Sequence, residues 1–124
     1  MLQVLLIGCG GFIGTVARYG VATLAYRLLG VSFPYGTLSV NILGCLFIGF
    51  VSIATEEREF IAQSTRLYLT IGLLGGFTTF SSFGYETLTL LRIGSIFPAV
   101  LYVLASVVTG LVAVWLGGVL ARAV

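Results

Sequence analysis

One short uncharged stretch of the chain gathers aromatic rings, hydroxyls and glycines. Residues 75–84 read GGFTTFSSFG and include no charged or aliphatic side chain. Glycine and hydroxyl residues are poor helix formers that favour caps and turns. The flanking sequence is apolar enough to span a membrane, and broken backbone at membrane depth is tolerated only where protein or water covers it. The stretch therefore predicts an interrupted helix at a site.

The rings and the backbone of this stretch could bind ions of opposite sign. Phe80 and Phe83 are three residues apart, so on a helix that restarts there both rings would lie on one side. A phenyl ring has a positive edge, and two rings turned edge-on could coordinate a small anion, although membrane phenylalanines ordinarily pack in the core. An unwound GGFTT segment also frees carbonyl oxygens, which bind hard cations such as Na⁺.

Further uncharged donors lie in the second and fourth apolar segments. Asn41 shares a helical face with Thr37, and its amide could bond a neighbouring helix or line a pathway. Tyr102, Ser106 and Thr109 recur at helical spacing, which fits a polar track or local bonding to the preceding turn. An anion path needs such donors, whereas a cation path commonly uses carboxylates or carbonyl rings.

The composition is that of an integral membrane protein. Of the 124 residues, 59% are hydrophobic and 8% are charged, whereas soluble domains carry about 25% charged residues. The chain has no His, Lys or Asp, so acid–base catalysis, proton relays and His-based metal sites are poorly supplied. An enzyme is therefore not expected. The net charge of +2 is too small to indicate nucleic-acid binding.

Hydropathy divides residues 1–124 into four apolar spans of a single transmembrane domain. The spans cover about residues 2–29, 34–54, 66–91 and 97–120, each long enough to cross a bilayer. We therefore predict an all-α membrane protein with four transmembrane helices, the third broken near its centre. The N-terminus lacks a basic segment, so we expect a retained first helix rather than a cleaved signal. Cys9 and Cys45 are expected to be packing thiols.

Two charged side chains fall within the predicted spans. Arg18 could reach the lipid headgroups or face a polar vestibule. Glu86 could pair with an arginine or cap exposed backbone at the break. The remaining acids lie in the polar segment TEEREFIAQST at residues 55–65, which we interpret as a solvated loop.

The loop charges give almost no bias in orientation. Three arginines lie on one predicted side and two on the other, so the positive-inside rule gives no firm topology. Small residues in GxxxG spacing, such as Gly10 and Gly14, allow helices to approach closely. Both features favour an antiparallel homodimer of dual topology. The arginines counted are Arg58, Arg66 and Arg122 against Arg27 and Arg92.

These motifs together resemble the Fluc (CrcB) family of small fluoride channels. The resemblance rests on residues 75–83 followed by Glu86, on the run VNILG at 40–44, and on the glycine-rich first span ending in ARY at 17–19. It covers the whole chain. It implies passive, fluoride-selective efflux across a bacterial-type cytoplasmic (inner) membrane, which lowers fluoride toxicity, through an antiparallel homodimer with two ion paths.

The family pattern also implies roles for individual residues. A central sodium ion would be held by the backbone carbonyls of Gly75 and Thr78 from both subunits. Gly110 stands where the polar track of the family often continues with a hydroxyl, and the adjacent Thr109 would substitute for it. The implied fluoride path consists of Asn41, Phe80, Ser82, Phe83, Tyr102 and Ser106.

Two other functions fit the sequence less well than a fluoride channel. A small multidrug-resistance-type transporter also has four spans, but its chemistry uses a carboxylate in the first span, and residues 2–29 contain none. A non-transporting assembly subunit would explain the glycines, but not the aligned hydroxyls together with Asn41 and the broken span. The expected partners are the fluoride ion, the lipid bilayer and a second copy of the chain, and not nucleic acid.

Overall fold

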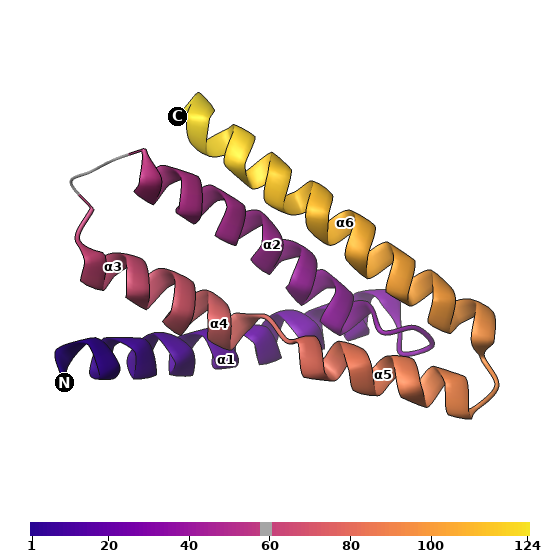
Figure 1. Cartoon of the computed structure of the whole chain (residues 1–124). Helices are drawn as coiled ribbons and strands as arrows, with labels where there is room; N and C mark the ends of the chain where they lie inside the picture. Colours follow the sequence, from indigo (N-terminus) through magenta and orange to yellow (C-terminus); the bar gives the residue numbers. More distant parts are fainter. Residues whose placement is uncertain (58–60) are drawn as a thin grey trace.

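The computed structural model describes residues 1–57 and 61–124, and within these residues the regular structure is helical. Arg58 and Glu59 of the predicted loop lie outside the described residues. The third span runs through three successive segments and is then interrupted before α5 (Figure 1). The elements are α1 (Leu2–Leu29), α2 (Tyr35–Glu56), α3 (Gln63–Leu67), the π-helical η1 (Tyr68–Leu74), α4 (Gly75–Phe77), α5 (Phe80–Arg92) and α6 (Ile96–Ala123). The predicted break in the third helix is confirmed.

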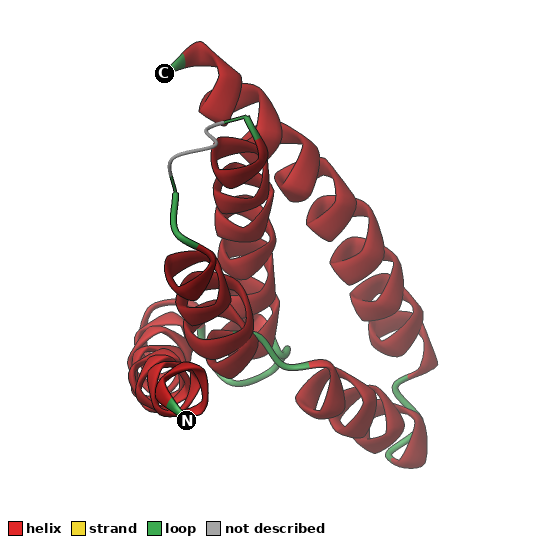
Figure 2. Cartoon of the chain, turned by 60° about the vertical axis from the view of Figure 1, so that its left-hand side comes forward, coloured by secondary structure: helices red, strands yellow, loops and turns green. Residues whose placement is uncertain are grey.

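Three of these helices are each long and apolar enough to cross a membrane, namely α1, α2 and α6. α6 runs beside α2, while α1 packs against η1 and α4 (Figures 1 and 2). Both termini and the end of α2 lie at one end of the molecule, and the α5–α6 turn lies at the other (Figure 1). This arrangement agrees with four successive crossings.

Glycines allow two of these helix pairs to touch backbone to backbone. A Cβ atom at Gly14 would lie 2.0 Å from the carbonyl oxygen of Leu73, in the contact between α1 and η1. A Cβ atom at Gly117 would lie 2.0 Å from the carbonyl oxygen of Leu46, in the contact between α6 and α2. No side chain fits at either position, so both contacts depend on glycine.

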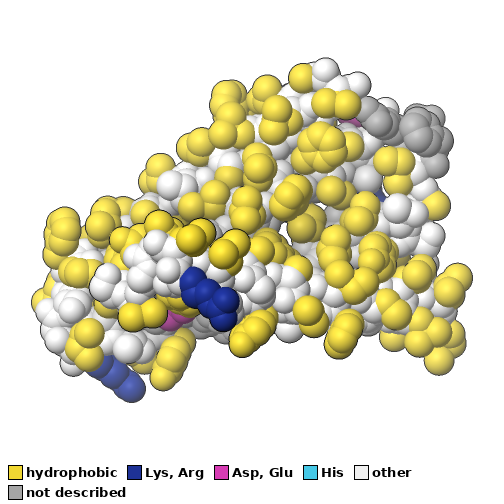
Figure 3. Space-filling model, turned by 180° about the vertical axis from the view of Figure 1, so that it is seen from behind, with side chains coloured by type: hydrophobic (Ala, Val, Ile, Leu, Met, Phe, Trp, Pro, Cys, Tyr) yellow, Lys and Arg dark blue, Asp and Glu magenta, His cyan; other side chains and the backbone are white. Residues whose placement is uncertain are grey.

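Large apolar side chains cover the outside of the chain. Phe12 on α1 is 71% exposed, and Leu111 and Trp115 on α6 are 68% and 66% exposed. Figure 3 shows hydrophobic side chains spread over one whole face, with charged groups confined to a few places. A surface of this kind belongs against lipid rather than water. The chain is accordingly a membrane protein.

Candidate functional site

The helix break consists of two extended residues. Thr78 has φ −82° and ψ 157°, and Thr79 has φ −149° and ψ 113°. The helix restarts at Phe80, where the Thr79 hydroxyl caps it by accepting a hydrogen bond from the Ser82 backbone N–H at 3.2 Å. The break is shorter than the ten-residue stretch that suggested it, because residues 75–77 and 80–84 are helical.

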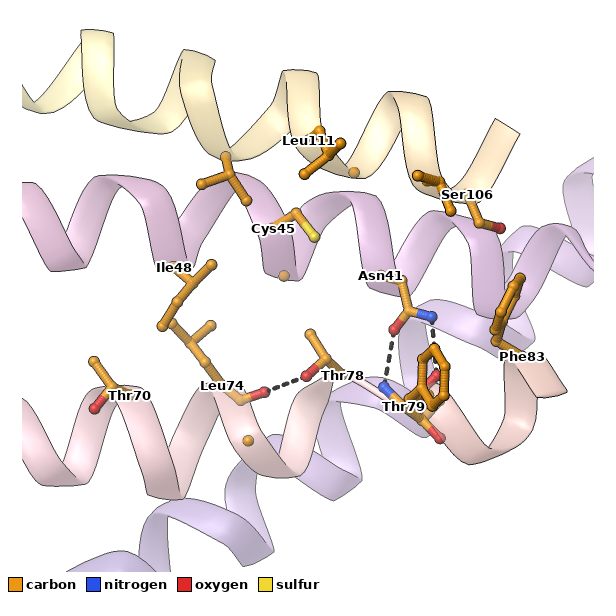
Figure 4. A pocket seen from close by; sticks show the side chains of 16 residues that line it. Asn41, Cys45, Ile48, Thr70, Leu74, Thr78, Thr79, Phe83, Ser106 and Leu111 are labelled. Carbon is orange, nitrogen blue, oxygen red and sulfur yellow. Dashed lines mark hydrogen bonds between the residues drawn. The ribbon is translucent and has the colours of Figure 1, made fainter. Parts of the chain in front are cut away.

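Asn41 on α2 binds the broken backbone through both ends of its amide. Its Oδ1 accepts a hydrogen bond from the Thr79 N–H at 2.8 Å, and its Nδ2 donates to the Thr79 carbonyl at 2.9 Å (Figure 4). The bond to a neighbouring segment, one of the two roles left open by the sequence, is thus observed. The second N–H of Nδ2 is not used in this pair of bonds.

A cavity of about 500 Å³ lies beside the break, between α2, α6 and the third span (Figure 4). None of the residues that line it carries a charge, and Cys45 and Gly110 are among them. Ser82, Tyr102 and Thr109 lie outside this lining. The structure does bring together six of the residues named from the sequence, namely Asn41, Gly75, Thr78, Phe80, Phe83 and Ser106.

The two phenylalanine rings lie close together at the restart of the helix. The ring centroids of Phe80 and Phe83 are 5.5 Å apart, with planes inclined by 41°. Phe83 also packs against the ring of Tyr102, at a centroid distance of 5.3 Å. Phe80 is 83% exposed, so core packing within one chain does not account for it.

Glu86 accepts hydrogen bonds from hydroxyls on three other helices. Tyr102 donates to Oε2 at 2.7 Å, Thr37 donates to Oε1 at 2.7 Å, and Tyr26 approaches Oε1 at 3.4 Å. These donors come from α6, α2 and α1, so the carboxylate joins four helices. Neither the arginine partner nor the backbone-capping role considered for Glu86 is observed among the described residues. Tyr102 is fully buried in this cluster.

The remaining hydroxyls of the predicted path make local bonds. The Ser82 hydroxyl accepts a hydrogen bond from the Thr79 hydroxyl at 3.0 Å, so its own proton is left for another acceptor. The Thr109 hydroxyl donates to the Ala105 carbonyl one turn earlier on α6. The structure therefore gives no sign that Thr109 supplies the hydroxyl missing at Gly110, which itself lines the cavity.

Arg18 on α1 reaches the backbone at the break. Its Nη1 lies 3.5 Å from the Thr78 carbonyl oxygen, at the long limit of a hydrogen bond. This carbonyl is one of the two predicted to hold sodium. Among the described residues, no three His, Cys, Asp or Glu side chains form a metal-binding group. A sodium site would thus depend on backbone oxygens, and it stays a prediction.

Comparison with known proteins agrees with this geometry. Residues 5–118 match the family described as CrcB-like protein, Camphor Resistance (CrcB). The chain belongs to this family. A relative from Geobacter sulfurreducens is 49% identical over 122 residues, which are 98% of both chains. A relative from Chlorobium phaeobacteroides is 47% identical over 118 residues, or 95% of this chain and 91% of the relative. Both relatives are named fluoride-specific ion channel FluC.

The structure places three further residues at the site, to none of which a role was assigned from the sequence. Thr79 anchors Asn41 and caps α5, and Thr37 and Tyr26 bind Glu86. The position of Thr37 four residues before Asn41 was a usable signal, as was the place of Thr79 in the hydroxyl-rich stretch. Tyr26 gave no signal, because its partner lies 60 residues away.

Proposed function

We propose that this chain forms a fluoride-selective channel that lets fluoride leave the cell passively and so lowers its toxicity. The relatives named as fluoride channels match almost the full length of the chain. The observation that carries the proposal is the uncharged cavity beside the helix break, lined by the amide of Asn41, the hydroxyl of Ser106 and the rings of Phe80 and Phe83. The function is transport rather than enzymatic catalysis.

The chemistry of this lining suits fluoride. Fluoride is small and strongly hydrated, so a pore must replace its water with several donors. A fixed positive charge in the narrow part would trap the ion, whereas amide, hydroxyl and ring-edge contacts spread the coordination over weaker partners. Selectivity against chloride would then follow from narrowness and hydrogen-bond strength.

A second copy of the chain is needed to close the site. Gly75 is exposed beside the break, Phe80 is 83% exposed, and the cavity is open on one side. Irregular backbone facing lipid would leave polar groups unsatisfied, so protein must cover this surface. The nearly even distribution of loop arginines favours an antiparallel partner. We assign the homodimer to the cytoplasmic membrane, with two separate fluoride paths.

Sodium fits the backbone at the centre of such a dimer. The carbonyls of Gly75 and Thr78 are hard oxygen ligands, and two copies would supply four of them. A bound cation would hold the two breaks together by balancing their carbonyl dipoles. The Arg18 guanidinium near the Thr78 oxygen would have to give way when the cation binds.

The proposal is tested by fluoride efflux from liposomes that contain the purified protein, measured with a fluoride-selective electrode. We expect rapid efflux that follows the electrical gradient, with chloride retained in matched vesicles. Equal chloride efflux would contradict selectivity. Fluoride movement that requires a proton gradient would contradict a passive channel and favour a coupled transporter.

A further inference from the structure

The hydrogen bonds at the break explain which carbonyls are free. In a continuous α-helix the N–H of residue i donates to the carbonyl of residue i−4. Thr79 would then donate to Gly75, and Ser82 would donate to Thr78. Instead the Thr79 N–H donates to Asn41 Oδ1 at 2.8 Å, and the Ser82 N–H donates to the Thr79 hydroxyl at 3.2 Å. Two side chains thus take up two of the N–H groups that would have closed the helix.

The carbonyls of Gly75 and Thr78 are thus among those that lose their helical partners at the break. Both residues line the cavity. Thr78 receives only the long contact from Arg18 at 3.5 Å. Gly75 lies on the exposed surface of the chain. These two carbonyls are also the ones that the family resemblance assigns to sodium.

Asn41 acts on this backbone more directly than any other residue near the break. Its second bond, from Nδ2 to the Thr79 carbonyl at 2.9 Å, fixes the peptide groups on both sides of Thr79 (Figure 4). One N–H of Nδ2 and the acceptor oxygen are therefore committed to the backbone, so at most one N–H remains for an ion. One of the two N–H donors and one of the two acceptor lone pairs of the amide thus serve the break.

We propose that Asn41 is a positioning residue: it captures the Thr79 N–H, keeps the Gly75 carbonyl free and thereby sets the affinity of the protein for sodium. The sodium half of this inference rests on the proposed function. The hydrogen-bonding half concerns the backbone alone and can be measured on protein that carries no ion.

The test compares Asn41→Leu with Asn41→Asp in purified, detergent-solubilised protein. Leucine has a similar size but cannot hydrogen bond, whereas an aspartyl oxygen can still accept from the Thr79 N–H. Amide hydrogen exchange is followed on the peptide that contains Thr79. Sodium binding is followed as the rise in Tm when sodium chloride replaces N-methylglucamine chloride. Ser106→Ala is the matched control, because it removes a polar group from the opposite wall of the cavity without contacting the break.

We expect Asn41→Leu to slow the exchange of the Thr79 N–H by about tenfold, the scale of one hydrogen bond, because the helix closes onto the Gly75 carbonyl. Faster exchange would mean that the released N–H has no partner and that the Gly75 carbonyl is free without Asn41, which overturns the proposal. The same variant should lose the rise in Tm with sodium. Asn41→Asp should keep the wild-type exchange rate and part of the sodium response, and Ser106→Ala should keep both.

The proposal is overturned if Asn41→Leu exchanges at the wild-type rate, if its sodium response persists, or if the wild-type protein gains no stability from sodium. If Asn41→Leu does not fold, Asn41→Asp decides: exchange there that matches the wild type supports the capture of the Thr79 N–H, and a tenfold change overturns it. Liposomes that carry no fluoride flux, together with the expected exchange and sodium results, would refute the channel function and leave the role of Asn41 standing.

Discussion

Glu86 is the residue at which the helices of one chain meet. A carboxylate inside a membrane protein is unfavourable unless its oxygens accept hydrogen bonds, and here hydroxyls from three other helices supply them. The short bond from the buried Tyr102 is therefore expected to stabilise the fold. Tyr102→Phe keeps the ring packing against Phe83 and removes only this donor. It should lower the free energy of unfolding by about 1–2 kcal/mol, measured by denaturation in mixed micelles.

Tyr26→Phe is the matched comparison for this hydroxyl. Tyr26 approaches the same carboxylate at 3.4 Å rather than 2.7 Å, so its loss should lower the free energy of unfolding by less than about 0.5 kcal/mol. If both variants lower the free energy of unfolding equally, the two hydrogen bonds to Glu86 are equally strong, and the difference in distance does not reflect a difference in energy.

Substitutions of the two phenylalanine rings at the start of α5 should affect fluoride efflux and thermal stability differently. Phe80 is 83% exposed in one chain, whereas Phe83 packs on Tyr102. We expect Phe80→Ile and Phe83→Ile each to slow fluoride efflux without abolishing dimerisation, because each variant removes a ring edge from the path. Phe83→Ile should also lower Tm, because it removes the packing of the ring against Tyr102 within one chain. Wild-type efflux from both variants, measured in the liposome assay, would assign the rings to packing alone.

At the scale of elements, hydropathy and residue type predicted the four spans and the break. They did so because apolar length and helix propensity are local properties. The predicted first span ends at the same residue as α1, and the break falls inside the predicted stretch. The hydrogen-bond partners of Asn41 and Glu86 could not be predicted from local sequence properties, because each bond joins residues at least 16 positions apart. The π-helical turns of η1 were also not predicted.

The packing of α1 against η1 gives an element-scale prediction. Gly14→Ala would place a Cβ atom 2.0 Å from the Leu73 carbonyl oxygen, so the two helices must separate. We expect the free energy of unfolding to fall by about 2 kcal/mol, with Tm falling in parallel. Gly8→Ala on the same helix meets nothing within 4 Å and should not lower stability, because alanine favours a helix more than glycine does. A tolerated Gly14→Ala would mean that α1 moves freely against η1.

At the scale of the whole molecule, two arginines form ion pairs at one end of the helix bundle. Arg122 pairs with Glu57 at 3.1 Å, and Arg66 lies 3.8 Å from Glu56, both at the end that holds the termini. All four side chains are more than half exposed, so these pairs add little stability. They do not create an orientation signal either, because acidic residues contribute little to topology. The described residues are thus compatible with insertion in both directions.

The antiparallel dimer predicts which positions can be cross-linked. With Cys9 and Cys45 first replaced by serine, Gly75→Cys should link two copies through a short thiol-specific reagent, because the breaks meet at the centre of the dimer. Val31→Cys should not, because in antiparallel copies the two residues lie at opposite ends of helices that are 28 residues, or about 42 Å, long. Gel mobility of the linked product reports both results. Linking through position 31 but not through position 75 would instead require parallel copies, and the even division of loop arginines would then have no bearing on assembly.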